Sequence, residues 1–304
     1  MTQTTDYGRM TPDAIGFIMK EMVRRAIEVI RAQRFAFEVH AKEGHSGLLD
    51  DIFTSADEAA QAVYVKMIRE AFPGYGIVAE EDHLRVEADP KIGMFITVDP
   101  LDGTKAFKRR QSHGIGTMIA LVRGTEVIAA YVGDVMTREI YGYRPESRKV
   151  HRISEYGYGE TLKADETTPL AKQNILIRER PENHAPLAKR MIAARDAGGL
   201  FKDFETASGS IGVSTARLWK GEVGAVLLKA AFETPWDCAP VYGICERLGF
   251  EMLVQNSPGD RWLDLRWDIP DRTRPLGYDQ LIIHRSRIPE LMEYMRANDP
   301  RGRP

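Results

Sequence analysis

The chain has 304 residues, which fits one large or two medium domains, and 43% of them are hydrophobic, which excludes a disordered chain. The net charge of −2 gives no basic excess for a nucleic-acid backbone, and two cysteines exclude a disulfide scaffold and favour a reducing compartment. The sequence has no run of about 18 apolar residues and no apolar signal segment at its N-terminus. We therefore expect a cytoplasmic globular protein with no membrane or nucleic-acid polymer as a partner.

The first half of the chain predicts two helices followed by a largely antiparallel sheet. Apolar residues at helical spacing follow Thr11 and Pro12 in a segment that runs to about Val39, and Ser55 is placed to cap a second helix. Pro73-Gly74 then breaks the chain, and the apolar pattern shortens to that of strands. These strands are expected at residues 75–79, 94–98, 115–122, 126–132 and 139–143.

The second half alternates strands and helices, which predicts helices packed on a mixed sheet. The expected strands are 174–177, 202–206, 223–228, 250–254 and 278–284, and the expected helices are 184–195, 209–220, 236–248 and 288–296. A polar, strand-poor segment at 155–172 separates the halves. We therefore place the domain boundary near residue 155, with an N-terminal α+β domain (1–155) and a C-terminal α/β domain (156–304).

Acidic motifs lie at the ends of predicted strands and at the start of one predicted helix, where an α/β protein places its ligand sites. They are Glu80-Glu81-Asp82, Asp99-Pro100-Leu101-Asp102-Gly103-Thr104 and Trp236-Asp237. Pro100 restricts Asp99 to an extended conformation and Gly103 permits a tight turn, so Asp99, Asp102 and the Leu101 carbonyl are expected to converge. Converging carboxylates repel one another unless a cation lies between them. All-oxygen ligands favour Mg²⁺, with Mn²⁺ as the alternative.

The order of these motifs resembles that of the inositol monophosphatase superfamily, whose pattern is a Glu pair, Asp-Pro-(Ile/Leu)-Asp-Gly-(Thr/Ser), and then Trp-Asp. Thr54-x-x-Asp57 matches an upstream element of the family, and Gly209-Ser210 with Lys220-Gly221 matches a weaker one. The resemblance runs over roughly residues 12 to 285. It implies a layered αβαβα sandwich of mixed α/β class, of the inositol monophosphatase and fructose-1,6-bisphosphatase type.

The resemblance also implies a lithium-sensitive phosphomonoesterase that uses two or three Mg²⁺ ions. It assigns Glu80, Asp99 and the Leu101 carbonyl to the first ion, and Asp99, Asp102 and Asp237 to the second. Asp99 would bridge the two ions.

The same resemblance assigns the catalytic and phosphate-binding residues. Glu80 and Thr104 would orient a metal-activated water for attack on phosphorus, and Asp57 would accept a hydrogen bond from the Thr104 hydroxyl. The backbone amides of Gly103 and Thr104, at the start of a predicted short helix, would bind the phosphate.

Two residues beside the acidic motifs keep alternative interpretations. Glu81 either contacts a metal or only supports its loop. Lys42 is either a cation close to the metal site or a solvated loop lysine.

The substrate side is less specific than the metal side. Lys105 begins a basic cluster with Lys108, Arg109 and Arg110 that could attract an anionic substrate, and Arg178 and Arg180 could reach a second phosphate. Inositol phosphatases carry a substrate-binding Glu seven residues before the last metal Asp, and the equivalent position here is Ala230. This departure weakens the assignment to inositol phosphates. A separate departure, Pro240-Val241, alters the substrate-facing wall beside Asp237.

The expected partner is a small phosphorylated metabolite, and several functions that act on such a substrate stay open. The segment 102–107 resembles 3′-phosphoadenosine 5′-phosphate phosphatases, whereas 116–121 and 235–237 resemble histidinol-phosphate phosphatases. A function of another class is a non-catalytic metal-binding regulatory domain. The family resemblance also implies a homodimer.

Overall fold

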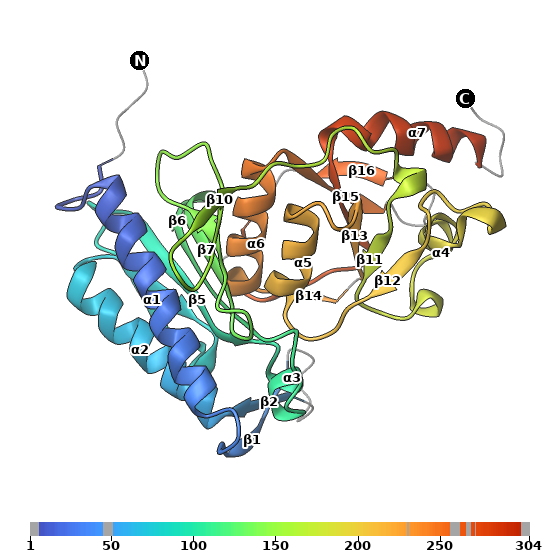
Figure 1. Ribbon diagram of the computed structural model, residues 1–304. Coiled ribbons are helices and arrows are strands. Elements are labelled where there is room, and N and C mark those ends of the chain that lie inside the picture. The colour runs from blue at the N-terminus through green and yellow to red at the C-terminus, as the bar shows by residue number, and fades with distance from the viewer. Residues whose placement is uncertain are drawn as a thin grey trace.

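The computed structural model describes residues 6–44, 51–229, 231–255, 262–265, 269–270 and 272–298. Its elements stack as two helices, an eight-stranded sheet, two more helices, a six-stranded sheet and an outer pair of helices (Figure 1). The predicted αβαβα sandwich is therefore confirmed. No helix among the described residues is both long and apolar enough to cross a membrane.

The outer layer of the first half consists of α1 (Pro12–Ala32) and α2 (Ser55–Ala71). Thr11 caps α1 as predicted, because its side chain accepts a hydrogen bond from the amide of Ala14. The helix ends at Ala32 and not near Val39, because residues 39–42 form a strand, β1, that pairs with β2 (Asp51–Thr54). Thr54, and not Ser55, is the N-cap of α2, because the Thr54 side chain and Asp57 complete a reciprocal capping box.

The first sheet has the strand order β10-β9-β8-β7-β6-β5-β3-β4 and is antiparallel except where β3 runs parallel to β5. Its strands are β3 (Gly76–Ala79), β4 (Arg85–Val86), β5 (Met94–Asp102), β6 (Gly116–Arg123), β7 (Glu126–Asp134), β8 (Ile140–Tyr143), β9 (His151–Ile153) and β10 (Gly159–Thr161). β10 lies in the segment predicted to be strand-poor, yet it pairs with β9 in this sheet. The domain boundary near residue 155 stays a prediction.

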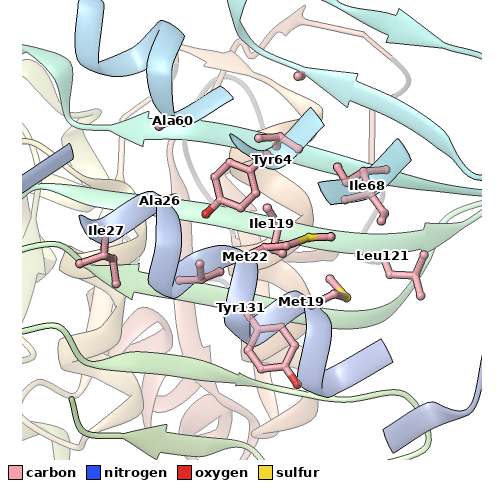
Figure 2. Close-up of a cluster of buried hydrophobic side chains, with 14 of the residues drawn as sticks. Met19, Met22, Ala26, Ile27, Ala60, Tyr64, Ile68, Ile119, Leu121 and Tyr131 are labelled. Carbon is pink, nitrogen blue, oxygen red and sulfur yellow. The ribbon is translucent and has the colours of Figure 1, made fainter. Parts of the chain in front are cut away.

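This sheet is buried on both faces, which fixes its position between two helical layers. Along β6, Ile119 and Leu121 belong to the same apolar cluster as α1 and α2, whereas Met118 and Ala120 belong to the cluster around α6. Figure 2 shows Ile119 between Met22 of α1 and Tyr64 of α2. Each fully buried aliphatic side chain of this kind contributes roughly 1.5–3 kcal/mol to folding.

The second sheet is mixed, as predicted, with the order β12-β11-β13-β18-β15-β16. β11 is parallel to β12 and β13, and the other neighbours pair antiparallel. Its strands are β11 (Ile175–Ile177), β12 (Phe204–Thr206), β13 (Ala225–Leu228), β15 (Phe250–Gln255), β16 (Trp262–Leu265) and β18 (Gln280–His284).

Helices cover both faces of this second sheet (Figure 1). α5 (Ile211–Trp219) and α6 (Pro235–Arg247) lie between the two sheets, and α4 (Pro186–Ile192) and α7 (Ile288–Ala297) pack on the outer face. α4 is shorter than the helix predicted for 184–195, since Pro186 begins it and residues 193–194 are extended. A two-stranded ribbon, β14 (Phe232–Glu233) with β17 (Arg274–Pro275), was not predicted.

Candidate functional site

Three carboxylates from two elements meet where the two sheets face each other. Asp99 and Asp102 end β5, Asp237 lies in the first turn of α6, and one oxygen from each lies within 4.8 Å of the others. Asp99 is only 2% exposed, and its Oδ1 has no hydrogen-bond partner among the described residues. Burial and the neighbouring carboxylates raise the pKa of Asp99 well above its usual range, and burial raises that of Asp237 to about 7.

This arrangement fits a bound divalent cation. An orphaned, buried carboxylate oxygen beside two further carboxylates is unfavourable without a positive charge. An all-oxygen donor set suits a hard ion such as Mg²⁺. Asp99, Asp102 and Asp237 are therefore the residues that would hold it.

Asp102 is oriented by the first turn of α5. Its Oδ1 accepts from the amide of Ile211 at 2.9 Å, and its Oδ2 accepts from the amide of Gly212 at 2.8 Å and from the Ser210 hydroxyl. The Ser210 hydroxyl also caps α5 by accepting from Val213. The sequence offered only the weak Gly209-Ser210 match, and the function of Ser210 in fixing Asp102 was missed.

The close approach of the α5 loop to β5 depends on Gly103. Gly103 has φ of +95°, a left-handed conformation that L side chains rarely adopt. A Cβ there would lie 2.7 Å from the Ser210 amide nitrogen. Glycine at this position lets the turn after Asp102 and the start of α5 come together.

Thr104 and Asp57 form a hydrogen-bonded pair beside the three carboxylates. Thr104 is the first residue of α3 (Thr104–Lys108). Its hydroxyl lies 3.0 Å from Asp57 Oδ1 and 3.1 Å from the Leu101 carbonyl oxygen. Asp57 Oδ2 accepts from the amide and hydroxyl of Thr54, at 2.8 and 2.6 Å. Burial raises the pKa of Asp57 to about 6, so the group is ionised at neutral pH and acts as an acceptor. The predicted contact between Asp57 and Thr104 is present.

The Glu pair lies beside a lysine that crosses from β1. Lys42 Nζ lies 2.8 Å from Glu80 Oε1 and 2.9 Å from Glu81 Oε1. Burial lowers the pKa of Lys42, but the two carboxylates more than offset this, and the net pKa lies above its usual value. The interpretation of Lys42 as a solvated loop lysine is therefore wrong, and Lys42 is a cation next to the acidic site.

Glu81 is held from two sides. Its side chain contacts Lys42, while its backbone amide and carbonyl are both bound by the Gln61 side chain, at 3.0 and 2.9 Å. Burial raises the pKa of Glu81 to about 8. Glu81 thus supports its loop, and Gln61 is a residue that the sequence analysis did not identify.

A cavity of about 540 Å³ opens above the carboxylates and is lined by Glu80, Asp102, Thr104 and Asp237. Lys105 and Arg178, which the sequence analysis names as substrate contacts, also line it. The Lys105 side chain is largely exposed, and the Arg178 guanidinium donates to the Gly209 carbonyl. Lys108, Arg109 and Arg110 are exposed and do not line this cavity. Ala230 lies outside the described residues.

Known proteins share this fold. The 121-residue segment shared with the Nus factor SuhB of Salmonella typhimurium is 34% identical and covers 37% of this chain and 44% of the relative, so the chain spans less than half the length of the curated relatives it matches. The structure of the Thermotoga maritima IMPase superimposes with a TM-score of 0.67 at 18% identity, over 94% of this chain and 97% of that one.

A structure described as an IMPase/NADP phosphatase complexed with Mg²⁺ and phosphate superimposes with a TM-score of 0.64 at 16% identity, over 95% of this chain and 97% of that one. At these identities, the likeness to solved structures establishes the fold alone. The model of the inositol monophosphatase family matches residues 13–273, which is most of the chain. The chain therefore belongs to the inositol monophosphatase family.

Proposed function

We propose that this protein is a Mg²⁺-dependent phosphomonoesterase that hydrolyses a small phosphorylated metabolite. The observation that carries the proposal is the group formed by Asp99, Asp102 and Asp237, in which the buried Asp99 Oδ1 has no partner among the described residues. Asp102 and Asp237 of this group line a cavity together with Thr104. The family match supports it, and so does the similar fold of an IMPase/NADP phosphatase whose structure is complexed with Mg²⁺ and phosphate.

The residues around this group have complementary functions in the proposed reaction. A bound Mg²⁺ supplies acidification of a water molecule and charge neutralisation of the phosphate. The Thr104 hydroxyl donates a hydrogen bond to Asp57. The lone pairs of the Thr104 oxygen are then free to accept a hydrogen bond from the attacking water. Glu80, which also lines the cavity, orients the same water, and the amides of Gly103 and Thr104 hold the phosphate oxygens.

Attack by water, without a covalent phosphoenzyme, is consistent with the side chains around Asp237. The adjacent Cys238 is buried, and burial raises the pKa of its thiol well above the usual value. Cys238 is thus protonated at neutral pH and is a poor nucleophile.

The alternatives differ in substrate or in class. A 3′(2′),5′-bisphosphate nucleotidase or a histidinol-phosphate phosphatase would use the same phosphate chemistry. A regulatory domain that only binds a metal would not need a hydroxyl oriented by a carboxylate, so the Thr104–Asp57 hydrogen bond favours an enzyme. The homodimer is proposed on the family resemblance, and the cytoplasmic location on the low number of cysteines.

The test is the release of phosphate from p-nitrophenyl phosphate with Mg²⁺, followed by a panel of inositol 1-phosphate, 3′-phosphoadenosine 5′-phosphate, histidinol phosphate and fructose 1,6-bisphosphate. Asp99→Asn is expected to remove the activity. Asp134→Asn is the matched control, because Asp134 is also buried and accepts from the amides of Met136 and Thr137, bonds that an asparagine oxygen retains. Mg²⁺ binding without hydrolysis of any ester would favour the regulatory domain.

A further inference from the structure

The wall of the cavity on the side of α6 differs from the metal side in its chemistry. We propose that this wall, an apolar lip formed by Leu228, Ala231, Phe232 and Leu276 and anchored by Glu233, selects phosphate esters whose alcohol carries an apolar face over esters of polyols. The inference rests on the proposed phosphatase function and deepens it, because it names the class of the leaving alcohol.

Glu233, the buried carboxylate in this wall, already accepts as many hydrogen bonds as its oxygens can. Its Oε1 accepts from the Tyr242 hydroxyl and from Gln280 Nε2, both at 2.8 Å. Its Oε2 accepts from Arg274 through Nε and Nη2, both at 2.8 Å. Four donors fill the acceptor positions of one carboxylate, so Glu233 has no position left for the hydroxyls of a polyol.

These four contacts also fix the lip in place. Glu233 faces Arg274 across the β14–β17 ribbon, and Phe232 faces Pro275. The Leu276 amide extends the pairing by donating to the Ala231 carbonyl at 2.8 Å. Because Tyr242 comes from α6 and Gln280 from β18, Glu233 joins the ribbon to both neighbouring elements. Glu233 is therefore a positioning residue for the lip.

The lip presents mainly apolar side chains to the cavity. Leu228, Ala231, Phe232 and Leu276 line this side together with one exposed cation, Lys229, and Phe232 is 40% exposed. Exposed apolar surface that borders a cavity gains free energy when a ligand covers it. The other acids that line the cavity lie elsewhere: Glu80, Asp102 and Asp237 at its base, Asp51 close to Lys105, and Glu179 on the loop after β11.

The first experiment compares two esters of primary alcohols, so that the acidity of the leaving group is matched. We expect kcat/KM for 2-phenylethyl phosphate to exceed that for glycerol 1-phosphate by about tenfold, the effect of burying one aromatic face at ~25 cal/mol per Å². Equal values, or a preference for glycerol 1-phosphate, would overturn the inference.

The second experiment tests the positioning role of Glu233. Glu233→Gln is expected to raise KM for 2-phenylethyl phosphate about tenfold, with kcat within about threefold and the KM for glycerol 1-phosphate unchanged, as a loss of uniform binding predicts. Glu205→Gln is the matched control, because Glu205 also accepts from an arginine and an amide, Arg217 and Asn174, but does not line the cavity. A general loss of activity with both esters would assign Glu233 a structural function only.

Phe232→Ala is a second test that applies even if Glu233→Gln does not fold. The exposed ring of Phe232 contributes less to folding than a buried ring would. The substitution should weaken the phenyl ester alone, and an equal effect on both esters would contradict the proposal.

A binding experiment separates failure of the phosphatase proposal from failure of the inference about the apolar lip. If neither ester is hydrolysed, calorimetry with the non-hydrolysable analogues 3-phenylpropylphosphonate and 3,4-dihydroxybutylphosphonate, with Mg²⁺ present, decides the inference by itself. Tighter binding of the phenyl compound supports the apolar lip, and equal or weaker binding refutes it.

Discussion

Replacement of Asp57 by asparagine would reverse one hydrogen bond and leave the others in place. Asp57 Oδ2 holds the Thr54 amide and hydroxyl, and its Oδ1 holds the Thr104 hydroxyl. An asparagine whose oxygen takes the Oδ2 position keeps both bonds to Thr54. Its NH₂ group then meets the Thr104 hydroxyl, which must accept where it had donated.

The expected loss of stability is small. The capping box at the start of α2 keeps its geometry, and a neutral acceptor replaces a charged one at a buried position. Such an exchange costs about 0.5–1.5 kcal/mol of the free energy of unfolding. Part of this is offset, because burial of the Asp57 charge is itself unfavourable and raises the pKa of Asp57 to about 6.

The expected loss of activity is much larger. The asparagine NH₂ takes one of the two lone pairs of the Thr104 hydroxyl and turns its proton away from residue 57, so the hydroxyl no longer presents the same acceptor geometry to the attacking water. Misplacement of the attacking water by about 1 Å lowers kcat by about 10²-fold. The assay is steady-state phosphate release at saturating substrate and Mg²⁺, together with thermal unfolding of the same preparation.

Thr54→Val is the matched control, because it removes the cap but leaves the contact between Asp57 and Thr104. It should cost about 1 kcal/mol of stability and keep kcat within about threefold of the wild type. The two variants would thus lose similar amounts of stability but very different amounts of activity. Equal losses of kcat in Thr54→Val and Asp57→Asn would refute the reasoning and reduce Asp57 to a helix cap.

Three further predictions concern the metal group and its neighbour Glu81. Asp99→Asn should abolish Mg²⁺-dependent activity and weaken Mg²⁺ binding in calorimetry, and a chelator-resistant enzyme would contradict this. In chelator, the free energy of unfolding should fall between about pH 4.5 and pH 8, because Glu81 and Asp237 have raised pKa values in the folded state, of about 8 and 7, and bind more protons there than in the unfolded chain. Thermal melts that show stability rising over this range would refute those shifts, and Mg²⁺ should raise the melting temperature more at pH 8 than at pH 6. Li⁺ should inhibit at about millimolar concentration, since a small cation competes for carboxylate sites. Inhibition should be uncompetitive with substrate, because Li⁺ would bind after the alcohol leaves and trap the product phosphate. Strictly competitive inhibition would exclude this trapping.

The sequence by itself determined the features that depend on neighbouring residues. The run from Asp99 to Thr104 specifies its own turn, since Pro100 restricts the backbone and Gly103 supplies the left-handed conformation. Apolar periodicity placed the helices and most strands, because it records which face of each element is buried. Element ends were less accurate, as at Ala32 and Thr54, because β1 pairing and a reciprocal cap decided them.

The tertiary structure alone decided how distant parts of the chain complete the site. Three sets of contacts join elements far apart in sequence: the α5 amides that hold Asp102, the lysine between Glu80 and Glu81, and the Arg274 and Gln280 donors on Glu233. Local patterns carry no record of such partners, because a buried carboxylate can be satisfied by any donor that the fold brings near. Ala230 showed where a family glutamate was missing, but only the β14–β17 pairing revealed that the nearby Glu233 is held by Arg274, Tyr242 and Gln280.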